Sequence, residues 1–307
     1  MCKIVVIGST NTDMSIQTDV LPKEGGIVAG GKFRVSSGGK GANEAIAASR
    51  LGGSVCLITK TGNDLLGRQA KQMFISEGIR TEYIFSDPDN PSGVALIMVN
   101  QKGDKYISLA QGSITNLSLA EIDKTRSEIS HADVLLIELE TPIETALYAA
   151  RIAAENGVPV VINPSPEQDL PDELFKLATY MLPNRTEARK ITGIKVMDFA
   201  SAEKAARTLA DKGVKTVILT MGSMGALMLD NGELTTIGAG DVEVKDVSGA
   251  GDVFCAAVCV AISEKKDLAT ALKMAATAAA LQVSRTGMSE SFPYRYEVEK
   301  AMKELDL

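Results

Sequence analysis

Short runs of consecutive apolar residues alternate along the chain with longer stretches in which apolar residues recur at helical spacing. The runs are rich in valine, isoleucine and leucine, as expected for parallel strands buried on both faces. Strands are predicted at residues 3–8, 55–61, 134–139, 158–163, 180–182 and 216–221. Helices are predicted at residues 42–51, 67–77, 119–129, 143–156, 200–212, 253–263 and 268–284. This alternation predicts an α/β fold with a doubly wound, mainly parallel sheet flanked by helices.

Two regions interrupt the alternation and predict a small second sheet. Residues 13–37 are rich in glycine, polar and β-forming residues, and residues 93–111 are predicted to form two strands around an Asn-Gln-Lys-Gly turn. Another hairpin is predicted at residues 225–238, with its turn at residues 230–232. We therefore expect one α/β domain over residues 1–307 with a small β appendage.

Composition and charge exclude several classes of protein. The 307 residues are 45% apolar and 23% charged, which is ordinary for a globular protein. No apolar run approaches the roughly 18 residues that a membrane span needs, and the N-terminal run is too short for a signal peptide. The net charge of −7 argues against a general binder of nucleic acid or anionic membranes. A phosphorylated ligand would need a locally positive site made from backbone amides, helix N-termini, a lysine or Mg²⁺.

The cysteines and the histidine predict no disulfide framework and no zinc site. Cys2, Cys56, Cys255 and Cys259 include no C-x-x-C pair. Cys255 and Cys259 lie four residues apart on a predicted helix, where we expect them to be buried. The single histidine, His131, has no partners for triad or metal chemistry, so a structural role is expected. This pattern fits the reducing cytoplasm.

The first motif with chemical potential is Ser-Gly-Gly-Lys-Gly-Ala-Asn at residues 37–43. Its glycines permit a close approach of the backbone to a ligand. Lys40 supplies a positive charge, and the side-chain amide of Asn43 can both donate and accept hydrogen bonds. It is not a Walker A loop, because Gly41 stands where Ser or Thr would bind Mg²⁺. The alternative is a flexible glycine turn before a helix.

The second motif is Asp-Val-Ser-Gly-Ala-Gly-Asp at residues 246–252, before a predicted helix. A glycine loop at a helix N-terminus forms an anion site from free N–H groups. The bulky Phe254 and the long helix that follows do not match a dinucleotide-binding fingerprint. Asp252 would repel a phosphate unless it acts on the attacking group, which predicts a general base for phosphoryl transfer to a hydroxyl. The alternative is a helix-capping aspartate.

Polar residues also follow the carboxyl ends of several predicted strands. Ligands of open α/β sheets bind outside these ends. Asn, Asp and Glu suit a polyhydroxyl ligand because each can make bidentate hydrogen bonds. Any single segment could be a turn or a cap, but together they predict a binding edge. The segments are residues 8–13, 138–140, 163–166, 183–187 and 220–223.

In these motifs the chain resembles the ribokinase family of sugar and nucleoside kinases. The resemblance covers nearly the whole chain and is carried by residues 8–13, 38–43, 139–142, 183–187, 220–223 and 248–252. It implies a β-sheet lid, formed by the two insertions, that also joins two copies into a homodimer. It implies phosphorylation of D-ribose at O5 by ATP, giving D-ribose 5-phosphate and ADP, with Mg²⁺ and K⁺ as cofactors.

The resemblance also implies a role for each matching residue. Asp252 would take the proton from the 5-hydroxyl, and the amides of Gly249, Ala250 and Gly251 would hold the phosphoryl charge. The residues implied to bind the sugar are Asn11, Asp13, Gly39, Lys40, Asn43, Glu140 and Asp252. Those implied at the phosphates, Mg²⁺ with its waters, and the nucleotide are Asn184, Glu187, Thr220, Gly222 and Ser223. Those implied to enclose K⁺ are Asp246, Ser248, Gln282, Arg285, Gly287 and Ser291. Apart from the Asp246 carboxylate, these K⁺ ligands would be backbone or hydroxyl oxygens, and backbone carbonyls are indifferent to side-chain identity.

Some positions depart from the family pattern. Residues 23–27 replace the usual lid turn, and Ala276 stands where a polar contact to adenine often occurs, so none is assigned there. Glu44 stands where glutamine is usual, and we expect it to lie outside the groups that contact the sugar. The open alternatives are a sister kinase for a ketohexose, 2-deoxyribose or a nucleoside, and a sugar- or nucleotide-sensing protein without catalysis. A nicotinamide-dependent oxidoreductase is disfavoured by the missing fingerprint after the first strand.

Overall fold

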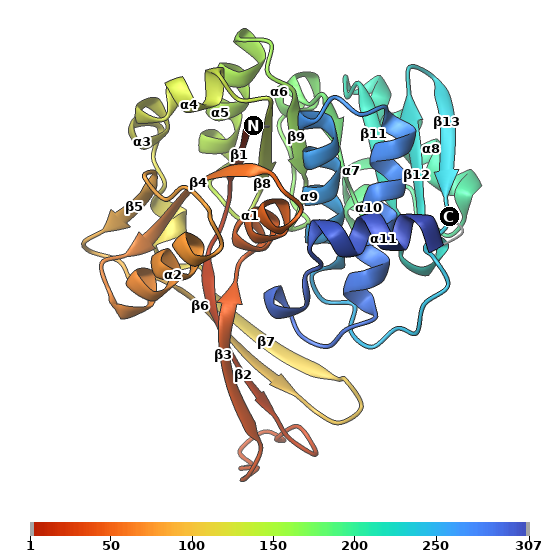
Figure 1. The fold of residues 1–307 in the computed structure, drawn as a ribbon. Helices are drawn as coiled ribbons and strands as arrows, with labels where there is room; N and C mark the ends of the chain where they lie inside the picture. Colours follow the sequence, from red (N-terminus) through yellow and green to blue (C-terminus); the bar gives the residue numbers. More distant parts are fainter. Residues whose placement is uncertain (1–2, 305–307) are drawn as a thin grey trace.

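The computed structural model describes residues 3–304, which form two sheets (Figure 1). The main sheet has nine strands in the order β13-β12-β11-β10-β9-β8-β1-β4-β5. It is parallel from β11 to β5, and the hairpin β12–β13 adds an antiparallel edge. Its strands are β1 (Lys3–Ile7), β4 (Ser54–Gly62), β5 (Ile84–Asp87), β8 (Val134–Glu138), β9 (Val160–Asn163), β10 (Tyr180–Met181), β11 (Thr216–Thr220), β12 (Ala226–Asp230) and β13 (Glu233–Ile237).

Helices cover both faces of this sheet, as the predicted doubly wound fold requires. Alternate residues of β1 enter different apolar clusters, Ile4 on one face and Val5 on the other. The first face is covered by α1 (Lys40–Arg50), α2 (Leu65–Ser76), α9 (Ala250–Ser263), α10 (Leu268–Val283) and α11 (Arg295–Glu304). The second is covered by α3 (Leu119–Lys124), α4 (Arg126–Ser130), α5 (Ile143–Glu155), α6 (Asp172–Leu177), α7 (Arg185–Thr192) and α8 (Phe199–Asp211). Short 3₁₀ helices lie at Gly112–Asn116, Gly222–Met224 and Ser289–Ser291.

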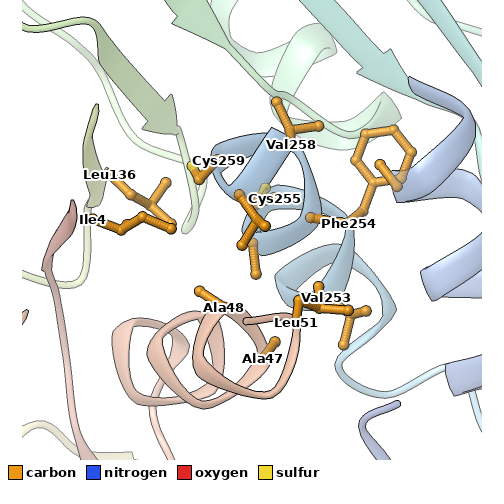
Figure 2. Close-up of a cluster of buried hydrophobic side chains, with 14 of the residues drawn as sticks. Ile4, Ala47, Ala48, Leu51, Leu136, Val253, Phe254, Cys255, Val258 and Cys259 are labelled. Carbon is orange, nitrogen blue, oxygen red and sulfur yellow. The ribbon is translucent and has the colours of Figure 1, made fainter. Parts of the chain in front are cut away.

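Helix α9 is the buried centre of the first face. Figure 2 shows its side chains between the sheet residues Ile4 and Leu136 and the end of α1 at Leu51. Cys255 and Cys259 are buried on this helix, as predicted. Cys2 lies outside the described residues.

The second sheet is formed by the two β-rich insertions and is called the lid sheet here. Its strands are β3 (Lys32–Gly38), β2 (Asn11–Gln17), β6 (Gly93–Val99) and β7 (Lys105–Ala110), in that order. The lid sheet projects away from the main sheet (Figure 1). The predicted turns at residues 100–103 and 230–232 connect strands as expected. Asn11 and Asp13, which follow the first predicted strand, lie on strand β2.

The predicted helix at residues 119–129 is wrong in one respect, because α3 and α4 are separate helices. Thr125 ends α3: its N–H and its hydroxyl both donate to the carbonyl of Ile122. Tightening of this kind is common at the last turn of a helix. Among the helices of residues 3–304, none is both long enough and apolar enough to cross a membrane.

Candidate active site

The site is organised around the first turn of α9. Gly249 takes a left-handed conformation with φ of 77° and is the N-cap residue, so α9 begins at Ala250. A residue with positive φ is best supplied by glycine. Asp252 lies within the first turn, and its carboxylate accepts a hydrogen bond from the side-chain amide of Asn43 on α1 at 2.8 Å. Asp252 is therefore bonded across to another helix and does not cap its own.

Helix α1 brings Lys40 and Asn43 to the carboxyl end of β1. The helix lies so close to this strand that a Cβ atom on Gly41 would be 2.5 Å from the Cα of Gly8. The amide of Ala42 donates to the carbonyl of Ser9 at 2.9 Å. The glycine motif therefore forms the end of α1 that packs against the end of β1, and its glycines allow the two backbones to approach closely.

Strand β8 contributes a pair of glutamates at its carboxyl end. The carboxylate of Glu138 accepts from the amides of Ser9 and Glu140, the latter at 2.8 Å. The hydroxyl of Ser9 donates to Glu140 and accepts from the amide of Lys40 at 3.0 Å. Burial, together with the charge of Glu140, raises the pKa of Glu138. Glu138 is thus a buried residue that positions Glu140 through hydrogen bonds, a role that the sequence motif did not reveal.

The lid sheet adds Asn11 and Asp13, which lie two residues apart on β2 and so share one face. Neighbouring glycines leave room for both side chains. A Cβ on Gly38 would lie 2.0 Å from Asp13 Oδ1, and a Cβ on Gly93 would lie 2.2 Å from Asn11 Oδ1. Burial raises the pKa of Asp13 to about 6, helped by the charge of Glu140.

Lys40 is a half-buried cation among these carboxylates. Burial alone would lower its pKa, but the charges of Asp252 and Glu140 outweigh burial and raise the pKa, so that Lys40 stays protonated. Burial raises the pKa of Asp252, and Lys40 and Asn43 oppose that rise. A carboxyl group with a raised pKa is a stronger base than an ordinary aspartate.

Two buried acceptors of the cluster have no hydrogen-bond partner within residues 3–304. They are the Oδ1 atoms of Asn11 and Asn43. A buried acceptor without a donor costs roughly 1–3 kcal/mol, so these atoms are suited to accept from a ligand. Hydroxyl groups of a sugar are donors of the required kind.

A cavity of about 540 Å³ adjoins the first turn of α9 and meets α10 and the end of β11. The predicted nucleotide residues Thr220, Gly222 and Ser223 line it, and so do Ala250 and Gly251. Most of the other residues that line the cavity are small or apolar, which suits a flat aromatic ring. The volume of the cavity is typical of cofactor sites. The remaining lining residues are Gly225, Gly238, Ala239, Gly240, Val242, Val244, Val247, Phe254, Ala276, Ala279, Ala280 and Val283.

Asn184 and Glu187 form the capping box of helix α7. Asn184 Oδ1 accepts from the amides of Thr186 and Glu187, each at 2.9 Å, and the Glu187 carboxylate accepts from the amide of Asn184 at 2.8 Å. Neither residue lines the cavity, although Asn184 pairs with the cavity residue Thr220 in an isolated β-bridge. Burial raises the pKa of Glu187.

Helix α7 was not predicted, although Asn-x-x-Glu at residues 184–187 is a recognisable signal for a helix start.

The described residues contain no cluster of three or more His, Cys, Asp or Glu that could hold a metal ion. Mg²⁺ commonly binds through one or two carboxylates, phosphate oxygens and waters, so Glu187, whose capping-box partner Asn184 pairs with the cavity residue Thr220, fits a magnesium nucleotide.

The residues implied to enclose K⁺ come together, but their polar groups are bonded to one another. Asp246 accepts from the amides of Ser248 at 2.9 Å and Gly287 at 3.3 Å. The side-chain amide of Gln282 lies among the implied oxygen ligands, and Ser291 also donates to it. The Arg285 guanidinium pairs with Glu297 at 2.6 Å. This arrangement does not fit K⁺ in the way that the resemblance implied.

Glu44 is a buried carboxyl beside the candidate base. Its Oε1 accepts from the side-chain amide of Asn163 at 2.8 Å, and its Oε2 has no partner among the described residues. Burial and the charge of Asp252 raise the pKa of Glu44 well above its ordinary value. A protonated glutamate has nearly the shape of glutamine, which explains how the chain accommodates the departure from the family pattern.

Comparison with known proteins agrees with this geometry. A family model described as pfkB family carbohydrate kinase matches residues 1–295. The chain is 38% identical to the ribokinase of Haemophilus influenzae over 294 residues, covering 96% of each protein. It is 33% identical to the deoxyribokinase of Salmonella typhi over 291 residues, covering 94% of this chain and 95% of that protein. A structure of Arabidopsis thaliana ribokinase complexed with ribose and ATP superposes with a TM-score of 0.92 at 29% identity, covering 99% of both chains.

The fold and the polar cluster therefore define a kinase with an α/β core and a β-sheet lid. The chain belongs to the pfkB family of carbohydrate kinases. The expected ribokinase-like fold is confirmed. Membership of this family also removes the oxidoreductase alternative.

The raised pKa of Glu44 predicts a pH effect on stability that glutamine removes. Folded Glu44 keeps its proton above the pKa of about 4.5 that it has when unfolded. Between that pH and the folded pKa only the unfolded chain loses the proton, so the free energy of unfolding falls as pH rises. Glu44→Gln should match the wild type below about pH 4.5 and become more stable above it. The gain should reach at most about 1.4 kcal/mol per pH unit.

Urea unfolding between pH 4 and pH 9 measures this difference in free energy. Glu155→Gln on the exposed surface of α5 is the control, because it makes the same chemical change at an exposed position. Parallel pH profiles for the wild type and Glu44→Gln would show that the Glu44 proton does not affect folding.

Proposed function

We propose that this kinase phosphorylates D-ribose at O5 with ATP, giving D-ribose 5-phosphate and ADP. The observation that carries the proposal is the first turn of α9. Ala250 and Gly251 line the cavity, and one residue later Asp252 bonds into the polar cluster. One helix start thus serves a nucleotide site and a sugar site. The ribokinase relatives and the structure with ribose and ATP support this assignment.

In this proposal the polar cluster holds the sugar, and Asp252 accepts the proton of the 5-hydroxyl. The oxygen O5 then forms a bond to the terminal phosphorus of ATP, and the bond from phosphorus to the leaving ADP oxygen breaks. The amides of Gly249, Ala250 and Gly251 donate to the phosphoryl oxygens as their charge develops. The sugar-binding side chains are Asn11, Asp13, Lys40, Asn43 and Glu140, with Gly39 contributing backbone.

The nucleotide occupies the cavity lined by Thr220, Gly222 and Ser223. Mg²⁺ would neutralise charge on the phosphates, and Glu187 would hold it through water, with Asn184 close by as the partner in the capping box. Both roles rest on the position of α7 at the end of the sheet. K⁺ is not part of this proposal, because the groups implied to bind it are bonded to one another.

The buried cysteines support the expected location in the reducing cytoplasm. Cys56, Cys255 and Cys259 are all free and buried. Disulfides are rare in that compartment, and thiols persist there.

Asp252→Asn tests the catalytic base. The amide keeps the shape and can still bond to Asn43, but it cannot accept a proton. We expect kcat to fall by about 10²–10⁴ while the affinity for ribose changes little. Steady-state kinetics and ribose titration calorimetry measure the two effects. Asp211→Asn at the exposed end of α8 is the control. Near-normal turnover by Asp252→Asn would contradict the assigned role.

A panel of acceptors tests the substrate, and it is needed because a deoxyribokinase is among the relatives. Asp13 can accept from two adjacent hydroxyls, and an analogue that lacks one leaves a buried acceptor unpaired. Such a loss costs about 1–3 kcal/mol, so ribose should exceed 2-deoxyribose in kcat/KM by about 10- to 100-fold. Rates with ribose, 2-deoxyribose, fructose and adenosine, with mass and position of the product phosphate, settle the choice. A preference for any of the other three would reject D-ribose and keep the kinase.

We also propose that the lid sheet joins two copies of this chain. The strand register places Met14 opposite Val35 and Leu96, and Ile16 opposite Phe33, so all five lie on one face. Four of these five residues are exposed by 40% or more. The face is opposite to that of Asp13, so a second copy can cover it without blocking the sugar-binding residues. An apolar sheet face with free strand edges is suited to a self-complementary interface.

Light scattering at micromolar concentration should therefore find a dimer. Phe33→Asp places a charge at the centre of the proposed interface and should shift the mass to that of a monomer. Leu65→Asp makes a comparable change at an exposed apolar position on α2 and should leave the dimer intact. A fully active wild-type monomer under these conditions would refute the interface.

A further inference from the structure

One buried side chain ties the glycine loop before α9 to the segment after α10. Gln282 lies near the end of α10 and is fully buried. Its Nε2 donates to the carbonyl of Ser248 at 2.9 Å and to the carbonyl of Gly287 at 3.3 Å. Its Oε1 accepts from the hydroxyl of Ser291 at 2.9 Å. Both amide protons and the amide oxygen are therefore used.

The partners of this amide are oxygens that the family resemblance assigns to K⁺. A bound K⁺ replaces its hydration shell with several oxygens that point at one centre. The NH₂ group of Gln282 lies at such a centre, within hydrogen-bond distance of the carbonyls of Ser248 and Gly287. An ion could reach these carbonyls only after the amide had moved away, and moving it would leave buried polar groups unpaired.

The negative charge of Asp246 is also compensated without a cation. Asp246 accepts from the backbone amides of Ser248 and Gly287. These hydrogen bonds to a carboxylate are the stronger, charge-assisted kind. The nearby Arg285 guanidinium is paired with Glu297 and also donates to the carbonyl of Ser291. The Asp246 carboxylate and the Gln282 side-chain amide together hold Ser248 and Gly287, the first through their N–H groups and the second through their carbonyls.

We propose that the carboxamide of Gln282 takes the place of a monovalent cation beside the Gly249–Gly251 loop. Gln282 is a positioning residue: it fixes the carbonyl of Ser248, and Ser248 directly precedes the loop whose amides are proposed to hold the transferring phosphoryl group. A donor that is already aligned loses no energy to reorientation during the reaction. This kinase then needs no K⁺ for activity. The rate measurement rests on the proposed function, whereas the stability measurement does not.

Two variants of Gln282 test this inference. Gln282→Ala removes the amide and leaves space among the oxygens, so it should create a K⁺ site. Gln282→Met removes both hydrogen-bonding groups and fills the same space, so it should lose the same contacts without admitting an ion. Gln168→Ala is the control, because Gln168 also donates its side-chain amide to a backbone carbonyl, that of Leu139, away from this cluster.

The first readout is the melting temperature in KCl, NaCl and tetramethylammonium chloride at equal ionic strength. The wild type and Gln168→Ala should melt at the same temperature in KCl as in the other two salts. Gln282→Ala should melt lower in NaCl than the wild type and recover with increasing K⁺ in a saturable way. Gln282→Met should melt lower in all three salts.

The second readout is the rate of sugar phosphorylation in the same salts. The wild type should vary less than twofold among them, and Gln282→Ala should lose at least fivefold in kcat without K⁺ and regain most of it with K⁺. A wild type that K⁺ activates several-fold and stabilises would overturn the inference, as would a Gln282→Ala variant with full activity and stability in every salt. If no sugar is phosphorylated, the proposed function is wrong, but the melting temperatures still show whether Gln282 takes the place of K⁺.

Discussion

The contact between helix α1 and the end of strand β1 sets the geometry of the whole site. A Cβ atom on Gly8 would lie 2.6 Å from the Cα of Gly41, so neither position has room for a side chain. This close contact allows the first turn of α1 to bond to the backbone after β1. Lys40 and Asn43 then reach the carboxylates that come from β8 and α9. A longer distance between helix and strand would separate the cation from the acids whose charges keep it protonated.

The sheet and the longer helices could be predicted because buried parallel strands are continuous apolar runs and their helices carry a clear period. The lid could be predicted from its turn at residues 100–103. The missed elements lack these signals. Helix α7 has eight residues and is mostly polar, and only its capping box marks it. The helix predicted at residues 119–129 is divided in the structure because the hydroxyl of Thr125 bonds back to the preceding turn, a local competition that periodicity does not register.

The candidate site was predictable in its residue types and not in its pairings. Motifs at strand ends indicate which side chains meet, but the Asn43–Asp252 bond joins positions 209 residues apart. The environment of Glu44 depends likewise on Asn163, which is 119 residues away. The family resemblance implies the K⁺ ligands, and departures from its pattern were expected to matter little because backbone carbonyls are indifferent to side-chain identity. That argument fails at Gln282, because its side chain is long enough to reach the same carbonyls.

The position of the α9 helix start between cavity and cluster has a consequence for the order of events. In the proposed reaction the two reactants approach the first turn of α9 from its two sides, and Asp252 between them accepts a proton and not a phosphoryl group. Such a site has no reason to store the phosphoryl group on the protein. Both reactants must then be bound together before any product leaves, and a single in-line displacement inverts the configuration at phosphorus. In the proposed reaction, a lid sheet that closed over the sugar would also keep water from taking its place as the acceptor, which would separate a kinase from a hydrolase.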